Sequence, residues 1–236
     1  MKKILLLAIL FLNVQLFAQK VKAAEKEQER ETAKEVGDSL LDVLDNEFET
    51  ATTYYDDGAK KSEGKVLRFG KWTYFHANGK VELEGNFKAN KKDSVWVRYN
   101  EEGVKLVSGS FVNGVKHGLW IIYFPNGKKH YELSFVNGKI NGKVQAWYET
   151  GILFKEENYV NGSKEGSFKT WYNTGKIKQE GAYLNNLKTG FWQTWHWNGK
   201  VETEGEYLAD KKVGRWTKYD DQGEIVERKT LPGAKP

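Results

Sequence analysis

The residues of this chain best suited to acid–base or metal chemistry are its histidines, because its 236 residues include no cysteine. His76 and His196 are five 24-residue periods apart, which is about 48 Å in a sheet with two strands per period. They therefore share neither a metal ion nor a proton. The sequence also lacks a phosphate-binding loop and the Gly-x-Ser-x-Gly and His-Glu-x-x-His motifs. We predict no catalytic, cofactor-binding or metal-binding residue, and we interpret the four histidines as exposed hairpin residues: His76, His117, His130 and His196.

A recurring glutamate is the second candidate for chemistry, because paired carboxylates hydrolyse glycosides. Copies of this residue would lie about 10 Å apart in a sheet, and no pocket is predicted that would raise the pKa of one of them. We therefore interpret the row as an exposed charge row balanced by lysines, and the protein as a non-enzyme. The row contains Glu84, Glu132, Glu156, Glu180 and Glu204.

Tryptophans form the third pattern, and two interpretations of them stay open. Trp147, Trp171 and Trp195 recur at 24-residue spacing, which places them about 9.6 Å apart in a sheet. They form either a platform for sugars or a partner, or a structural compensation for the smaller Val144 and Phe168. The candidate ligand or partner surface is Trp147, Trp171, Trp195, Trp192 and Trp197.

The 24-residue period organises residues 51–231. A large apolar residue, here called the anchor, recurs without an insertion in seven copies, and glycine follows it seven residues later in each copy. A degenerate eighth copy begins at Ala51, as capping of a repeat array predicts. The anchors are Trp72, Trp96, Trp120, Val144, Phe168, Trp192 and Trp216.

Each copy is predicted to form a β-hairpin. Asn78-Gly79 has the chemistry of a two-residue type I′ turn, and Asn113-Gly114 marks a second turn, predicted as a four-residue loop. This register places each anchor opposite the residue 13 positions later, often glycine, and places an aromatic ring opposite the glycine that precedes the anchor by two. Rings would therefore cover glycines. The fold class is all-β: an elongated single-layer antiparallel β-meander of about 16 strands, preceded by a short N-terminal helical segment.

Strand alternation assigns the rings to two faces. The anchors and the aromatic residues 15 positions later share one face, and the rings three positions after the anchors occupy the other. Leu133 and Glu157 replace the glycine that faces the anchor. We therefore expect altered ring-over-glycine packing within residues 120–167.

The N-terminus has the features of a secretory signal. Lys2-Lys3 precede an apolar run, and Ala18 precedes the expected cleavage site. The run is shorter than the ~20 apolar residues of a membrane span, so we expect no transmembrane span in the mature chain and a periplasmic or extracellular location. The expected organisation is signal peptide 1–18, charged linker with a short amphipathic helix 19–50, repeat array 51–231 and tail 232–236.

The pattern Gly-x-Trp-x-x-(Tyr/Trp)…Asn-Gly-Lys…Glu-Gly-x-(Phe/Tyr) resembles the MORN-repeat variant family, whose bacterial members include antitoxins of the YwqK type. The segments 118–128 and 190–207 carry it most clearly. The resemblance implies a hairpin array that contacts proteins or envelope surfaces, without a cofactor. The net charge of +5 is unevenly placed, with −5 in residues 19–50 and +6 in residues 70–229. Only three arginines occur in residues 70–229, whereas nucleic-acid-binding proteins usually concentrate Lys and Arg into a stripe. We expect an exported protein- or envelope-binding scaffold. One alternative is an antitoxin or immunity protein that binds a cognate toxin, and another is a glycan-binding module.

Overall fold

The computed structural model describes residues 51–54, 60–64 and 68–233, with side chains from residue 68 onward. The predicted signal peptide, linker and amphipathic helix of residues 1–50 lie outside the described residues, as does most of the tail. Within the described ranges the fold is all-β. None of these residues forms a helix long and apolar enough to cross a membrane.

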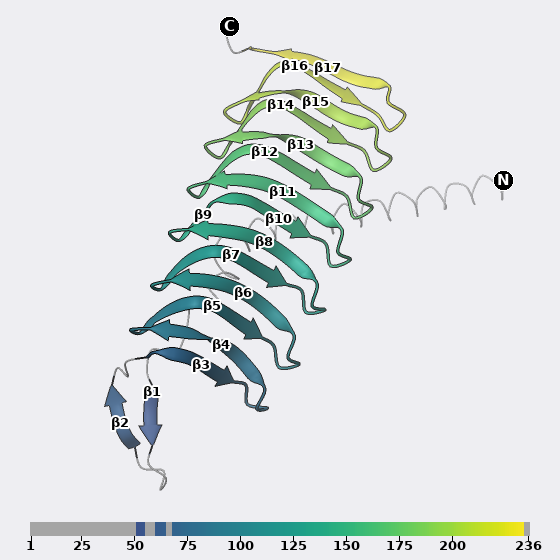
Figure 1. Ribbon diagram of the computed structural model, residues 1–236. Helices are drawn as coiled ribbons and strands as arrows, with labels where there is room; N and C mark the ends of the chain where they lie inside the picture. The colour runs from purple at the N-terminus through teal and green to yellow at the C-terminus, as the bar shows by residue number, and fades with distance from the viewer. Residues whose placement is uncertain (1–50, 55–59, 65–67, 234–236) are drawn as a thin grey trace, which may run out of the picture. The chain divides into compact units, whose positions relative to one another are not determined.

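Fifteen of the described strands form one antiparallel sheet in which consecutive strands are neighbours (Figure 1). The strands before the first irregularity are β3 (Gly70–Phe75), β4 (Val81–Lys88), β5 (Lys91–Tyr99), β6 (Lys105–Val112), β7 (Val115–Tyr123) and β8 (Lys129–Val136). A short β9 (Lys139–Ile140) pairs with β8, and β10 (Gly142–Trp147) continues the order. The remaining strands are β11 (Leu153–Val160), β12 (Ser163–Trp171), β13 (Ile177–Leu184), β14 (Leu187–Trp195), β15 (Val201–Leu208), β16 (Lys211–Tyr219) and β17 (Ile225–Leu231).

The predicted meander and its register are confirmed. Trp72 pairs with Gly85 and Gly70 with Phe87, and the later hairpins repeat this register. The degenerate first copy forms a separate two-stranded sheet from β1 (Ala51–Tyr54) and β2 (Lys60–Gly64). Its Ala51 pairs with Gly64 in the same register. The large sheet therefore has 15 strands where the sequence predicted a single meander of about 16.

The two turn types are the reverse of those predicted. The Asn78-Gly79 turn is a three-residue loop, closed by a bond of 2.8 Å from the His76 amide to the Lys80 carbonyl, with Gly79 at a φ of 82°. The second turn has two residues, Asn113 and Gly114, both with positive φ as a type I′ turn requires. The loops form one long edge of the sheet and the two-residue turns form the other (Figure 1).

The glycine two residues before the anchor allows a bulge in the backbone and does not make room for a ring. Ser110 pairs with His117 and Gly109 with Trp120, so Gly118 and Leu119 form a bulge. Gly118 has a φ of 68°, in the left-handed region that glycine adopts most easily. The expectation that a ring excludes any side chain here is wrong, because a Cβ added to the equivalent Gly190 would meet no atom within 4 Å.

Rings do cover the other set of glycines, but each ring comes from the next anchor in the chain and not from the anchor 13 positions earlier. A Cβ added to Gly85 would lie 2.2 Å from Cδ2 of Trp96, and one added to Gly109 would lie 2.2 Å from Cδ2 of Trp120. The indole nitrogen of Trp96 also donates to the carbonyl of Asn86 at 3.0 Å. Both tryptophans are 0% exposed. Each repeat thus contributes the glycine on which the next repeat packs its ring.

Gly109→Ala is expected to destabilise the sheet by about 3 kcal/mol, the upper end of the cost of overpacking a core. Because Trp120 is fully buried, its ring has no free space into which to move. Gly190→Ser is the matched control, since Ser94 occupies the equivalent bulge position with a φ of 61°. We expect this control to cost about 1 kcal/mol from left-handed strain. Urea unfolding measures both, and equal losses would contradict the ring-over-glycine packing.

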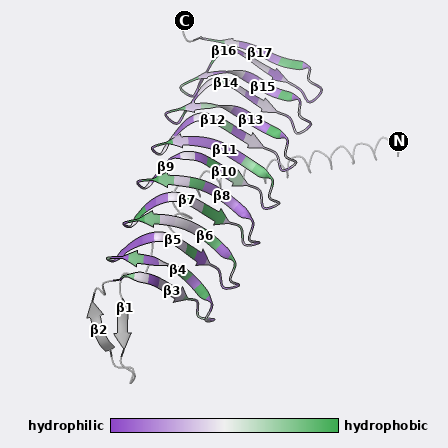
Figure 2. Cartoon of the chain, in the orientation of Figure 1, coloured by the Kyte–Doolittle hydropathy of each residue, from purple (hydrophilic) through white to green (hydrophobic). Residues whose placement is uncertain are grey.

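The anchors and the aromatic residues 15 positions later form a row of edge-to-face ring contacts, here called the ring face. Tyr183 packs against Trp192 with centroids 5.3 Å apart, and Tyr207 against Trp216 at 5.0 Å. Hydrophobic and hydrophilic stretches alternate along the strands in Figure 2, as expected for a sheet with two unlike faces. We call the opposite side the glutamate face, after the row of Glu84 and its equivalents.

Candidate functional site

Three of the predicted tryptophans form a row on the glutamate face. Trp147, Trp171 and Trp195 lie on β10, β12 and β14, with one strand between each pair, and all three are partly buried. The Lys129 ammonium that pairs with Glu132 at 2.6 Å also lies 5.6 Å from the Trp147 ring. Strand alternation places Val144 on the other face. Trp147 therefore does not occupy the volume left by the smaller anchor.

The two remaining tryptophans of the predicted surface have opposite environments. Trp192 is 2% exposed and packs in the ring-face core with Phe168 and Trp216, so its inclusion in the surface was wrong. Trp197 is 70% exposed, the highest value among the large apolar residues of the side-chain-described part. We call the set Trp147, Trp171, Trp195 and Trp197 the ring surface. It is distinct from the ring face, which contains the anchors.

Trp197 sits at the tip of a loop that is bonded to both neighbouring loops. Lys176 Nζ donates to the Asn198 carbonyl at 3.2 Å, which ties the loop to the preceding one. On the other side, His196 Nε2 lies 3.0 Å from the Tyr219 carbonyl and Asn198 Nδ2 donates to the Asp221 carbonyl at 2.6 Å. The exposed indole is therefore held on a fixed backbone, which lowers the entropy cost of using it in binding.

These loop contacts also explain the Asn-Gly-Lys motif, which sequence reasoning assigned to turn geometry alone. Asn78 Oδ1 accepts from the Lys80 amide at 3.0 Å, and Asn78 Nδ2 donates to the Glu101 carbonyl at 3.0 Å. Lys80 Nζ donates to the Glu102 carbonyl at 3.2 Å. The motif therefore joins consecutive loops along the edge.

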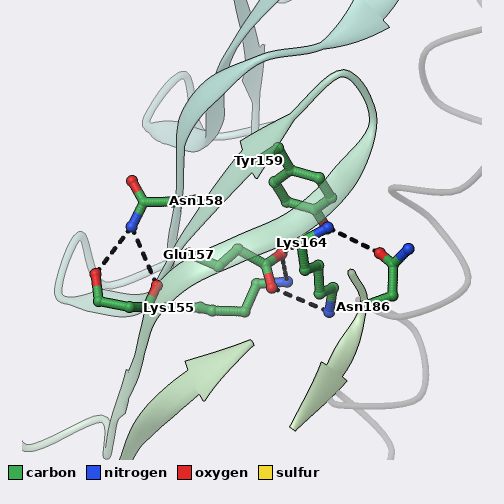
Figure 3. Close-up of polar contacts among 7 residues, drawn as sticks. Lys155, Glu157, Asn158, Tyr159, Lys164 and Asn186 are labelled. Atoms are coloured by element: carbon green, nitrogen blue, oxygen red, sulfur yellow. Dashed lines mark hydrogen bonds and ion pairs between the residues drawn. The ribbon is translucent and has the colours of Figure 1, made fainter. Parts of the chain in front are cut away.

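The ring face is interrupted once, at the fourth full repeat. Glu157 replaces the glycine opposite Val144 and is 1% exposed. Its carboxylate lies 2.8 Å from Lys155 Nζ and 3.1 Å from Lys164 Nζ, and accepts from the Tyr159 hydroxyl at 3.1 Å (Figure 3). A buried ion cluster thus stands where neighbouring repeats stack rings. Sequence reasoning expected altered packing here but missed the cluster, although Lys155 and Lys164 were visible signals.

The electrostatics of the cluster favour ionised Glu157. Burial opposes ionisation, but the ammonium groups of Lys155 and Lys164 outweigh it and hold the pKa of Glu157 below its ordinary value of 4.5. Burial and the neighbouring carboxylate raise the pKa of Tyr159, so its hydroxyl keeps its proton and donates. Three groups of this chain therefore surround the carboxylate.

The predicted pairing with lysines is confirmed for four of the five glutamates in the row. The fifth, Glu204, instead accepts from Gln193 and Tyr219, and all five side chains are partly buried where exposure was expected. Glu84 pairs with Lys71 at 2.8 Å, Glu156 with Lys143 at 3.1 Å, and Glu180 with Lys169 at 3.1 Å. In each pair the glutamate side chain is less exposed than the lysine side chain, and the two residues lie on neighbouring strands. Such partly exposed pairs are worth little individually. They balance the charge of this face.

The histidines do not converge on a site in the described part of the chain. His76 Nε2 lies 3.0 Å from the Tyr99 carbonyl, the same inter-repeat contact that His196 makes. A carbonyl oxygen can only accept a hydrogen bond, so Nε2 carries the proton in both His76 and His196. His130 stacks on Phe124 with centroids 4.0 Å apart. Burial lowers its pKa from 6.5 to about 4. The prediction of exposed histidines therefore holds for His117 but is wrong for His76, His130 and His196, which are partly buried.

We expect the His130 ring to gain its proton near pH 4 in the folded protein, and near pH 6.5 after unfolding. The unfolded state then binds more protons between these values, so stability falls as the pH decreases from 6.5 towards 4. His130→Phe removes that part of the loss. NMR titration of the ring proton measures the pKa, and a midpoint near 6.5 would contradict burial of the imidazole.

Among the side chains described, no group of three or more His, Asp or Glu residues is arranged to hold a metal ion. The sequence profile of the family described as MORN repeat variant matches residues 70–89, 116–137, 140–161 and 164–185. No curated protein matches the chain. The four matched segments each cover one hairpin or most of one, so the profile and the strand register mark the same unit.

Proposed function

Because the chain belongs to the MORN repeat variant family, we propose that it is an exported, non-catalytic scaffold that binds a protein through the ring surface. The observation that carries the proposal is Trp197. Six other repeats place Ala, Glu, Pro, Asn or Asp at this loop position, so the fold does not require an indole there. Exposed tryptophans on fixed backbones are typical centres of protein interfaces.

The rest of the ring surface supports a partner that spans several repeats. Trp171 and Trp195 lie about 9.6 Å apart, two strands per step. Trp195 is the last residue of β14, the strand that leads into the Trp197 loop. A partner seated on Trp197 would therefore reach one partly buried ring in the same repeat, Trp195, and one in the preceding repeat, Trp171. Export is supported by Lys2-Lys3 and the following apolar run.

Trp197→Ala is expected to abolish capture of the partner while leaving stability within ~0.5 kcal/mol, as surface changes do. Immobilised mature chain is incubated with envelope extract, and the bound proteins are identified by mass spectrometry. Phe69→Ala is the matched control, because Phe69 is an exposed ring, 57% accessible, outside the ring surface. One specific protein should be retained by wild type and by the control.

Capture of the same protein by a Trp147→Ala, Trp171→Ala, Trp197→Ala variant would refute the ring surface. A tryptophan fluorescence shift with peptidoglycan fragments, but with no captured protein, would favour the glycan-binding alternative. Capture of a single toxin whose activity is blocked would instead identify the scaffold as an immunity protein.

A further inference from the structure

The edge formed by the two-residue turns differs in charge from the opposite edge. The six five-residue segments at these turns contain nine lysines and a single acid, Asp210. Five of these lysines hold their ammonium groups over rings of the ring face. The other four, Lys88, Lys91, Lys139 and Lys211, are exposed. The seven corresponding loop segments at the other edge contain six acids and four lysines. We call the first the lysine edge. It consists of residues 88–92, 112–116, 136–140, 160–164, 184–188 and 208–212.

The lysine edge also exposes aliphatic side chains in a single row. The residue that enters each turn is aliphatic in five successive repeats, and each of these side chains is between 42% and 52% exposed. At two strands per repeat the row runs for about 38 Å. Exposed apolar rows of this extent mark interaction surfaces. The row consists of Val112, Val136, Val160, Leu184 and Leu208.

We propose that the lysine edge binds an acidic amphipathic helix of a partner protein. The aliphatic row would receive the apolar side of the helix, and lysines such as Lys139 and Lys211, both exposed, would face its carboxylates. One heptad of an α-helix advances about 10.5 Å, close to the ~9.6 Å between repeats. Three heptads therefore stay within about 3 Å of register, which flexible lysine side chains accommodate.

Other classes of partner fit this edge less well. The six segments contain no Phe, Tyr or Trp, whereas membrane surfaces are bound with interfacial Trp and Tyr. Single-stranded nucleic acids are bound by stacking on aromatic side chains, with a contribution from Arg. The six segments contain neither Arg nor an aromatic residue. Polyproline segments dock in aromatic grooves. An acidic helix is the partner that uses both the aliphatic row and the lysines.

The test uses the mature chain and a synthetic 28-residue peptide of four heptads, with leucine at every seventh position and glutamates on both sides of the leucines. Fluorescence anisotropy measures the Kd. A peptide of the same composition with scrambled leucines should bind at least tenfold more weakly. Binding of the ordered peptide should also weaken when salt rises from 50 to 300 mM, because the charges are screened.

Val160→Asp with Leu184→Asp is expected to weaken peptide binding at least tenfold. Val95→Asp is the matched control, since Val95 is 51% exposed, like Val160 at 52%, but lies away from the turns. It should change the Kd less than twofold. The proposal is overturned if ordered and scrambled peptides bind equally or if the aspartates have no effect. It is also overturned if phosphatidylglycerol vesicles bind at this edge and the peptide does not. Since Trp197 is untouched, failure here leaves the ring surface unaffected.

Discussion

Replacing Glu157 with alanine is expected to destabilise the sheet by about 3–5 kcal/mol, the cost of breaking a buried ion cluster. Lys155 is only 11% exposed in its side chain, so loss of the carboxylate leaves its ammonium group in the core without its counter-charge. The Tyr159 hydroxyl loses its acceptor as well. Chemical unfolding measures the change.

The matched control replaces the charges together. Lys155→Met, Glu157→Leu and Lys164→Met in one chain remove the ammonium groups along with the carboxylate, and substitution of buried ion clusters by apolar side chains is often neutral or stabilising. We expect this triple variant to recover most of the stability lost in Glu157→Ala. Equal losses in the two variants would mean that packing, and not charge, holds this repeat.

The lowered pKa of Glu157 adds a pH dependence with a defined sign. A carboxyl whose pKa is lower in the folded state contributes stability above its ordinary pKa of 4.5, and this stability is lost as the pH falls through the lower folded value. Wild type should therefore lose more stability below pH 4.5 than Glu157→Gln does. Equal slopes for the two proteins in acid unfolding would show that the cluster is not ionised.

Periodicity alone was enough to predict the sheet, the hairpins and the pairing of each anchor with the residue 13 positions later. It did not separate the two turn types, because Asn-Gly suits both a type I′ turn and a loop that ends in a left-handed glycine. The distinguishing signal was present within the chain. Glycine occupies the loop position in all seven repeats, while Asn186 and Asp210 take the left-handed place in the other turn.

The candidate site was less accessible to sequence reasoning. Trp192 and Trp197 are five positions apart, yet one lies in the core and the other at a loop tip. Strand alternation does not separate them unless the length of the loop is known. The ion cluster is not predicted by the repeat pattern, in which Glu157 is only a local departure from glycine. Its partners Lys155 and Lys164 come from neighbouring strands, β11 and β12, and converge only through the register.

Deletion of one whole repeat tests most directly the central claim that the sheet is built from 24-residue units held by their neighbours. Removing residues 94–117 joins Asp93 to Gly118 and restores the phase of every later strand. Removing residues 94–105 joins Asp93 to Leu106, so that Val107, which is 1% exposed, changes face. Far-UV circular dichroism and urea unfolding are measured on both. We predict a folded, cooperative protein with a proportionately smaller m-value for the first, and loss of the β-signal for the second. Equal loss in both would contradict the account.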